Sequence, residues 1–216
     1  MKIRSITLLQ DELDNGFAWR LKEIAAVKMS VESRSLSIAQ ATLIRAGVPL
    51  LYAHWEGFIK KSSRDYLEYV ANQRLKYGEL ASCFVVFGAK KHLLHVVESK
   101  RTAVNIAAVD FFRNCADARA DLKIPNAINT KSNLNSDVFA EIAMSLGVAT
   151  GPYDSYFNLI DESLLARRNA IAHGEYLDLN AKDFHNLADE VIKLMRMYKT
   201  DLQNLASLGA FRLKAA

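Results

Sequence analysis

Apolar residues recur every three or four positions along the first third of the chain, which is the spacing of amphipathic helices. A first such pattern runs from Ser5 to about Ser30. A second and longer one runs from about Ser37 to Asn72 and contains Pro49. Because a proline inside a helix removes a backbone hydrogen bond, we expect the second helix to begin near Pro49 or to kink there.

The middle of the chain is less regular than its two ends. An apolar stretch covers residues 80–87 and is expected to end at Gly88, and residues 96–118 fit either a helix or a strand. Residues 119–135 are polar and predict a long, less regular insertion. Three further helices are predicted at Ser136–Leu146, Tyr153–Ala172 and Ala181–Leu208. Together these patterns predict an all-α bundle with long helices.

Length and composition suit one soluble domain that spans residues 1–216. Half of the residues are hydrophobic, 24% are charged, and only three prolines and nine glycines interrupt the chain, which favours long helices. The N-terminal sequence reaches acidic residues before it builds a signal-like apolar core. No apolar run approaches the roughly 18 residues that a membrane span needs. We therefore expect a cytoplasmic protein with no membrane association.

Charge and cysteine content narrow the chemistry only a little. The net charge of +4 is compatible with a polyanionic partner, although many ordinary proteins carry as much. The two cysteines, Cys83 and Cys115, lie in apolar surroundings, and neither has a second Cys or a His at the spacing of zinc ligands. We expect buried free thiols, no metal site and no cofactor.

One short segment carries the most informative residues, between Asp161 and Glu175. On a regular helix, Arg168 and His173 would lie about 140° apart around the axis. Gly174 resolves this, since a glycine just past a helix end takes the left-handed conformation and frees the preceding residue from the helical lattice. A simpler account is that both basic side chains only stabilise the negative end of the helix dipole.

The sequence Arg-Asn-Ala-Ile-Ala-His-Gly at residues 168–174 resembles the Arg-x4-His motif of the HEPN superfamily. Residues 51–60 are similar to a helix of the MAE-type HEPN proteins, and residues 130–134 also fit that subgroup. The resemblance implies a helical bundle that forms a homodimer, with two copies of the motif meeting at the interface. It also implies ribonuclease activity in toxin–antitoxin, phage-defence or CRISPR-associated systems. Arg168 and His173 would be the catalytic pair, within residues 153–175, and Asn169 an accessory polar residue.

The residue types suit cleavage of RNA without a metal ion. RNA carries its own nucleophile, the 2′-hydroxyl group beside each phosphate. A histidine can move the proton of that hydroxyl, and an arginine can bind two phosphate oxygens while it stays charged. One chain supplies a single such histidine, whereas two chains related by a twofold axis supply two.

Basic residues outside the motif are candidates for contacts to the RNA backbone. The densest cluster contains Lys90, Lys91, Lys100 and Arg101, and Arg167 adjoins the motif. The alternative is that the cluster is an ordinary solvated segment.

Several other residues have a structural explanation that we prefer. His54 is expected to be a packed helical histidine, and Trp19 is expected to lie in the core or in a dimer interface. Asp161 and Glu162 face different ways on a helix, so we expect one of them to form an ion pair with Arg167 or Arg168 rather than a shared acid–base site.

The function that these observations favour is a metal-independent endoribonuclease, a toxin or defence enzyme that acts on RNA as a homodimer and is controlled by an antitoxin or another partner protein. The first alternative is a non-catalytic HEPN module that binds a nucleotide, RNA or a partner protein. A second alternative, a DNA-binding protein, is disfavoured by the lack of a recognisable helix-turn-helix and by the modest charge.

Overall fold

The computed structural model describes residues 2–34, 37–99, 101–122, 127–131 and 133–213. Within these ranges the regular structure is helical, and the extended pairing consists of two isolated antiparallel bridges, Lys76–Arg119 and Leu80–Arg212. The predicted all-α fold is therefore confirmed. No helix in these ranges is both long enough and apolar enough to span a bilayer.

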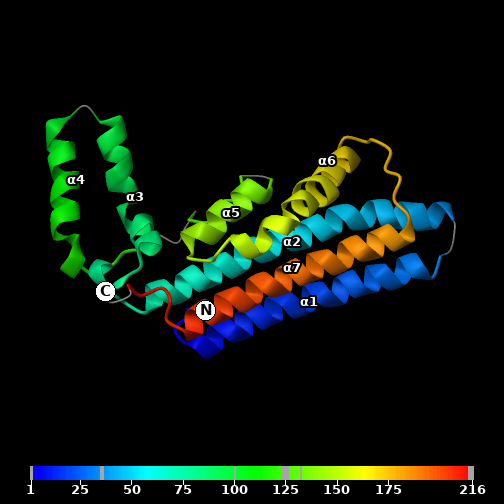
Figure 1. The fold of residues 1–216 in the computed structure, drawn as a ribbon, viewed down its shortest axis with the longest axis horizontal. Helices are drawn as coiled ribbons and strands as arrows, with labels where there is room; N and C mark the ends of the chain where they lie inside the picture. The colour runs from blue at the N-terminus through cyan, green and yellow to red at the C-terminus, as the bar shows by residue number, and fades with distance from the viewer. Residues whose placement is uncertain (1, 35–36, 100, 123–126, 132, 214–216) are drawn as a thin grey trace.

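Three long helices form the body of the molecule and lie side by side along its length (Figure 1). They are α1 (Ile6–Glu32), α2 (Ile38–Asn72) and α7 (Ala181–Ser207). Each begins at a polar cap, since the side chains of Ser5, Ser37 and Asn180 accept a hydrogen bond from a backbone N–H of the first turn. Large apolar side chains fill the space between the helices, among them Leu13, Ile24, Trp55, Phe58, Leu194 and Tyr198.

The helix that contains Pro49 does not begin at that residue. α2 starts at Ile38 with Ser37 as its cap, which confirms the bounds predicted from the periodicity, and it continues through Pro49, so the expected alternative of a start near the proline is wrong. Tertiary packing holds the turns on both sides of Pro49 in place, and Val48 is fully buried there. A Cβ at the neighbouring Gly47 would lie 2.6 Å from the ring of Phe184, so this glycine lets α2 and α7 approach closely.

Two helices form an arm that stands off the body (Figure 1). α3 (Ser82–Glu98) leads outward, and α4 (Thr102–Asn114) returns to the short turn η2 (Cys115–Asp117). α3 runs through Gly88, so the prediction that this element ends there is wrong. A Cβ at Gly88 would collide with Tyr77 of the turn η1 (Tyr77–Glu79), and this close packing explains the glycine.

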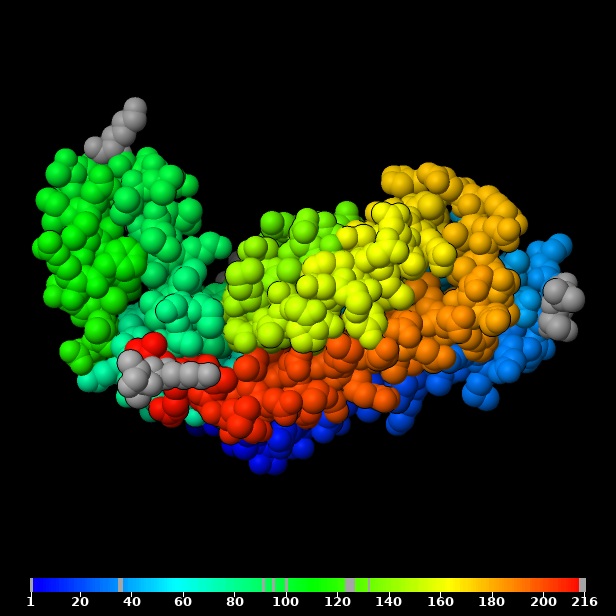
Figure 2. All heavy atoms as spheres, viewed as in Figure 1, coloured from blue at the N-terminus to red at the C-terminus, as the bar shows by residue number. Residues whose placement is uncertain are grey.

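The remaining elements lie along α2 and lead to the motif. α5 (Ser136–Ser145) follows the predicted insertion and begins at Asn135, whose side chain accepts from the Val138 N–H. The segment predicted as one helix, Tyr153–Ala172, is instead a 3₁₀ turn η3 (Gly151–Tyr156), a π-helix η4 (Leu159–Ala166) and the short α6 (Arg167–Ala172). Figure 2 shows that the arm and the α6 end both rise above α5, so this face of the molecule is concave.

Candidate functional site

A π-helix leads directly into the motif. Such wide turns are rare, and they occur often at functional sites. In η4, Ile160 and Leu164 are buried, and the Asp161 carboxylate accepts hydrogen bonds from the Ser136 N–H (2.7 Å) and hydroxyl (2.5 Å). Asp161 therefore satisfies an N–H at the start of α5, where helices attract negative charge. The predicted ion pair from Asp161 or Glu162 to Arg167 or Arg168 is wrong.

The end of α6 has the geometry expected from its glycine. Gly174 takes a φ of +82°, its N–H donates to the Ile171 carbonyl (3.1 Å), and the Glu175 N–H donates to the Ala170 carbonyl (2.9 Å). These two bonds form a Schellman end, in which His173 is the C-cap residue directly after Ala172, the last residue of α6. The His173 side chain is exposed and makes no hydrogen bond within the described ranges.

An arginine of α2 holds this turn from outside. The Arg45 guanidinium donates to the carbonyl oxygen of Glu175 and lies 3.5 Å from the carbonyl oxygen of Ile171. Carbonyl groups at a helix C-terminus lack partners within the helix, and a cation satisfies them well. Arg45 therefore fixes the backbone on both sides of His173. Sequence reasoning missed it, because 128 positions separate Arg45 from His173 in the chain.

Arg168 is held in place by neutral groups. Its Nη1 donates to the side-chain oxygens of Asn169 (2.7 Å) and Asn133 (3.1 Å), and its guanidinium lies 4.7 Å from the centroid of the Tyr52 ring. No carboxylate within the described ranges lies at ion-pair distance from Arg168. The guanidinium is partly exposed, so it presents an uncompensated positive charge with free donors.

The wall behind Arg168 is formed by α2 and the loop that precedes α5. The buried Tyr52 hydroxyl accepts from the Leu134 N–H (2.6 Å), and its burial raises the pKa of Tyr52 to about 12. One turn further along α2, the Glu56 carboxylate accepts from the Thr130 hydroxyl (2.5 Å). Tyr52 and Glu56 thus clamp residues 130–134 against α2 and beside the motif. Their i,i+4 spacing within residues 51–60 was a signal that could have indicated a shared face.

Comparison with known families gives a match over most of the chain. A model of the RiboL-PSP-HEPN family matches residues 15–204. The chain belongs to this HEPN family. Membership of the HEPN superfamily, expected from the motif, is therefore confirmed. No curated protein and no solved structure gave a significant match.

The structure gathers one group of the predicted HEPN site residues and separates the other. Arg168 and Asn169 lie on α6, His173 is its C-cap, and Arg167 is partly exposed at the start of the same helix. The basic cluster lies elsewhere: Lys90 is on α3, and Arg101 caps α4 at the tip of the arm, far from α6 in Figures 1 and 2. Lys100 and the side chain of Lys91 are outside the described residues.

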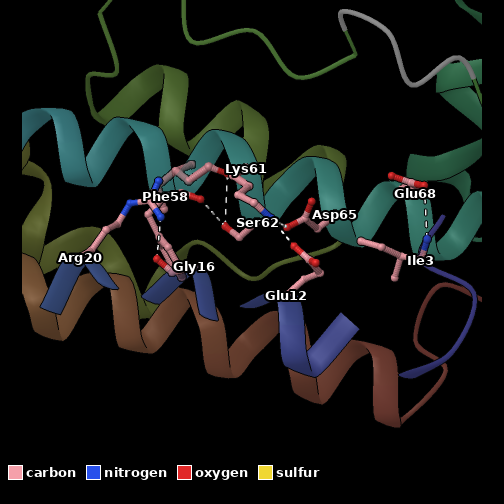
Figure 3. A network of polar contacts seen from close by, with 10 residues as sticks. Ile3, Glu12, Gly16, Arg20, Phe58, Lys61, Ser62, Asp65 and Glu68 are labelled. Atoms are coloured by element: carbon pink, nitrogen blue, oxygen red, sulfur yellow. Dashed lines mark hydrogen bonds and ion pairs between the residues drawn. The ribbon is translucent and has the colours of Figure 1, made fainter. Parts of the chain in front are cut away.

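Two further histidines and one polar network of this HEPN chain have structural roles. His54 is buried beside Trp19 of α1, with Nε2 2.9 Å from a Glu23 carboxylate oxygen, which confirms the packed histidine. His92 stacks on Phe111 inside the arm, with 4.0 Å between the ring centroids. Between α1 and α2, Lys61 bonds Glu12 and Asp65, and Arg20 donates to the Gly16 carbonyl (Figure 3). The described residues contain no group of three or more His, Cys, Asp or Glu that could hold a metal ion.

Proposed function

We propose that this HEPN chain is an endoribonuclease that cleaves RNA without a metal ion at a site formed by Arg168, Asn169 and His173. The observation that supports it most directly is the pairing, at one helix end, of an arginine without a carboxylate partner and an exposed histidine. Both groups are needed for phosphodiester cleavage, because negative charge develops on the phosphate while a proton moves between oxygens.

Each residue has a defined task in this mechanism. The free N–H donors of Arg168 bind the non-bridging oxygens of the phosphate, and Asn169 holds the guanidinium through its side-chain oxygen. The His173 imidazole removes the proton from the 2′-hydroxyl group or donates one to the departing 5′-oxygen. The 2′-oxygen forms a new bond to phosphorus while the bond from phosphorus to the 5′-oxygen breaks. The products are a 2′,3′-cyclic phosphate and a 5′-hydroxyl end.

The same proposal includes a homodimer with a composite site. One α6 end presents one histidine, whereas the reaction needs both a base and an acid. A twofold axis beside α6 would bring His173 of a second copy to the opposite side of the same phosphate. The biological setting that fits such an enzyme is a toxin or defence ribonuclease held in check by a partner protein. Lys90 and Arg101 stay predicted contacts for an RNA long enough to reach the arm.

Cleavage by the purified protein tests the assignment. Wild-type protein with labelled RNA in excess EDTA should yield fragments with 2′,3′-cyclic phosphate ends, and His173→Ala and Arg168→Ala should each lower the rate by about 10²–10⁴-fold. His185→Ala is the matched control, since it removes a partly buried histidine of α7 and should cleave like the wild type. A His173→Ala variant that cuts RNA at the wild-type rate would refute the site, and a requirement for added Mg²⁺ or Mn²⁺ would refute the mechanism.

The alternative is that the same surface binds RNA or a nucleotide and does not cut it. The observation that favours it is that a single chain presents only half of an acid–base pair at α6. In that case, wild-type protein would bind labelled RNA and leave it intact, and Arg168→Ala would weaken the binding. Sedimentation of the wild-type protein gives the second measurement, since a monomer at the working concentration of the assay would contradict the composite site.

A further inference from the structure

Exposed large apolar side chains are concentrated on the arm. Within the described ranges, fifteen large apolar side chains are exposed, and eight of them lie on α3 and α4, with exposed fractions of 44–84%. Those eight are Val86, Leu93, Leu94, Val96, Val97, Ile106, Val109 and Phe112. Single exposed apolar residues are ordinary on a protein surface, but a concentration of this kind marks an interaction site.

One side of the arm forms a wall of a cleft of about 710 Å³. Val86 and Leu94 of α3 line one wall, and Ile142 and Met144 of α5 line the other. Both walls are helices, and their apolar residues recur at helical spacing, so the cleft is a groove between two helices. A third helix that places its apolar face in such a groove would cover both walls at once.

Charge distinguishes among the helices that could lie there. The lining of the cleft includes two lysines, Lys90 and Lys131, and one acidic residue, Glu141. Over the whole arm, residues 82–114, the sequence has five basic and two acidic residues. We infer that the groove between α3 and α5 binds an amphipathic helix of a partner protein, with an apolar face and acidic residues along its flanks.

Two other occupants fit the groove less well. RNA would require exposed aromatic rings for base stacking, and among the described residues that line the groove the aromatic ring is that of Phe87, which is partly buried. A second copy of the chain would bring two basic arms together, and the like charges would repel each other. An acidic amphipathic helix complements both the apolar walls and the positive charge.

The groove also adjoins the loop that holds Arg168. Asn129 and Lys131 line the groove, and Asn133 of the same loop accepts the hydrogen bond from Arg168. A helix bound in the groove therefore lies one short loop segment from the proposed catalytic arginine. The docking proposal itself requires no ribonuclease activity, and its test measures binding alone.

A displayed library of 20-residue helical peptides, selected on the immobilised full-length protein, tests the proposal. We expect enriched sequences with apolar residues at helical spacing and with Asp or Glu on both flanks. One of the enriched peptides is then synthesised, and its affinity for the protein is measured by fluorescence anisotropy. Leu94→Asp and Met144→Asp alter opposite walls of the groove, and each should weaken the binding of this peptide by about tenfold or more. Lys90→Glu should also weaken binding, and more so at low salt. Leu208→Asp, an exposed apolar site at the end of α7, is the matched control and should change the affinity by less than about twofold.

Several outcomes would overturn the inference. The inference is wrong if the selection enriches no peptide or enriches basic helices. It is also wrong if the enriched peptides bind the Leu94→Asp variant as tightly as they bind the wild type. A wild-type dimer in sedimentation that Leu94→Asp converts to monomers would show that a second copy covers the groove. A single-stranded RNA that displaces the peptide, and whose own binding is weakened by both Leu94→Asp and Met144→Asp, would show that the groove itself binds RNA. Circular dichroism of each variant establishes that the helices are intact.

Discussion

Two arginines on opposite sides of α2 show how one side-chain type serves two purposes. Arg20 lies between α1 and α2, is only 6% exposed, donates to the Gly16 carbonyl (2.6 Å) and lies near the rings of Trp19 and Phe58 (Figure 3). Arg168 also lies over a ring, that of Tyr52, but it is partly exposed and its partners are two amide oxygens. Arg20 is enclosed between the packed helices, whereas Arg168 is held at the surface with N–H donors that are free to bind a ligand.

The difference is that Arg20 is enclosed by the helix packing, where a ligand has no access to it, whereas Arg168 is open to solvent. Burial lowers the pKa of Arg20, and the negative charge of Asp65 partly offsets that effect. Arg168 has no carboxylate at ion-pair distance within the described residues, and its guanidinium is partly exposed, so a ligand can reach it. A phosphate group is the natural partner of such a guanidinium.

The largest effect is expected from Arg168→Lys. The substitution keeps the charge but removes the planar fork that binds two phosphate oxygens, so RNA cleavage should fall by about 10²-fold while the thermal midpoint stays near that of the wild type. Initial rates with labelled RNA, together with a thermal scan, give both quantities. Wild-type rates in the lysine variant would mean that Arg168 acts only as a point charge.

The reverse pattern is expected for Arg20→Ala. Loss of the buried side-chain stem, the ring contacts and the Gly16 hydrogen bond should lower the free energy of unfolding by about 2–3 kcal/mol, measured in urea. Cleavage per folded molecule should be unchanged. Arg20→Met, which keeps the apolar stem, should lose about half as much. If Arg20→Ala lowered cleavage without loss of stability, the contrast between the two arginines would fail.

Substitutions of Tyr52 separate the ring that supports Arg168 from the hydroxyl that holds the loop. Tyr52→Phe removes the hydrogen bond from the Leu134 N–H and should cost about 1 kcal/mol of stability, with little change in RNA affinity. Tyr52→Leu also removes the ring below the guanidinium and should weaken RNA binding further, by up to about tenfold. Equal RNA affinity in the two variants, measured by anisotropy, would show that the ring does not position Arg168.

The smallest effect concerns His54, on the side of α2 that faces α1. Burial lowers the pKa of His54 below its usual 6.5, and the charge of Arg20 lowers it further, although Glu23 opposes the shift. The folded state thus favours the neutral imidazole, so its contribution to stability is present above pH 6.5 and is lost as the pH falls through the lowered pKa. Urea midpoints between pH 7.5 and 5 should decline less steeply in His54→Gln. An equally steep decline would assign the acid sensitivity to other groups.

Local sequence patterns were sufficient to predict the long helices and the C-terminal end of α6. The caps at Ser5, Ser37 and Asn180 and the left-handed Gly174 depend on residues within one or two turns, so they could be predicted one segment at a time. The same is true of the pairing of Arg168 with Asn169, which are neighbours in the chain. The catalytic proposal therefore came from the sequence alone, and the family match confirms the HEPN membership on which it rests.

Long-range packing decided which residues surround Arg168 and His173, because it brings together residues that are far apart in the chain. Tyr52 and Asn133 meet at Arg168, and Arg45 reaches the His173 turn, only because α2 lies alongside α6 and the loop before α5. Packing also stabilises α2 across Pro49 and α3 across Gly88, although local propensity predicted helix boundaries at these two residues. It placed Lys90 and Arg101 on an arm away from the motif, which no periodicity in the sequence could indicate.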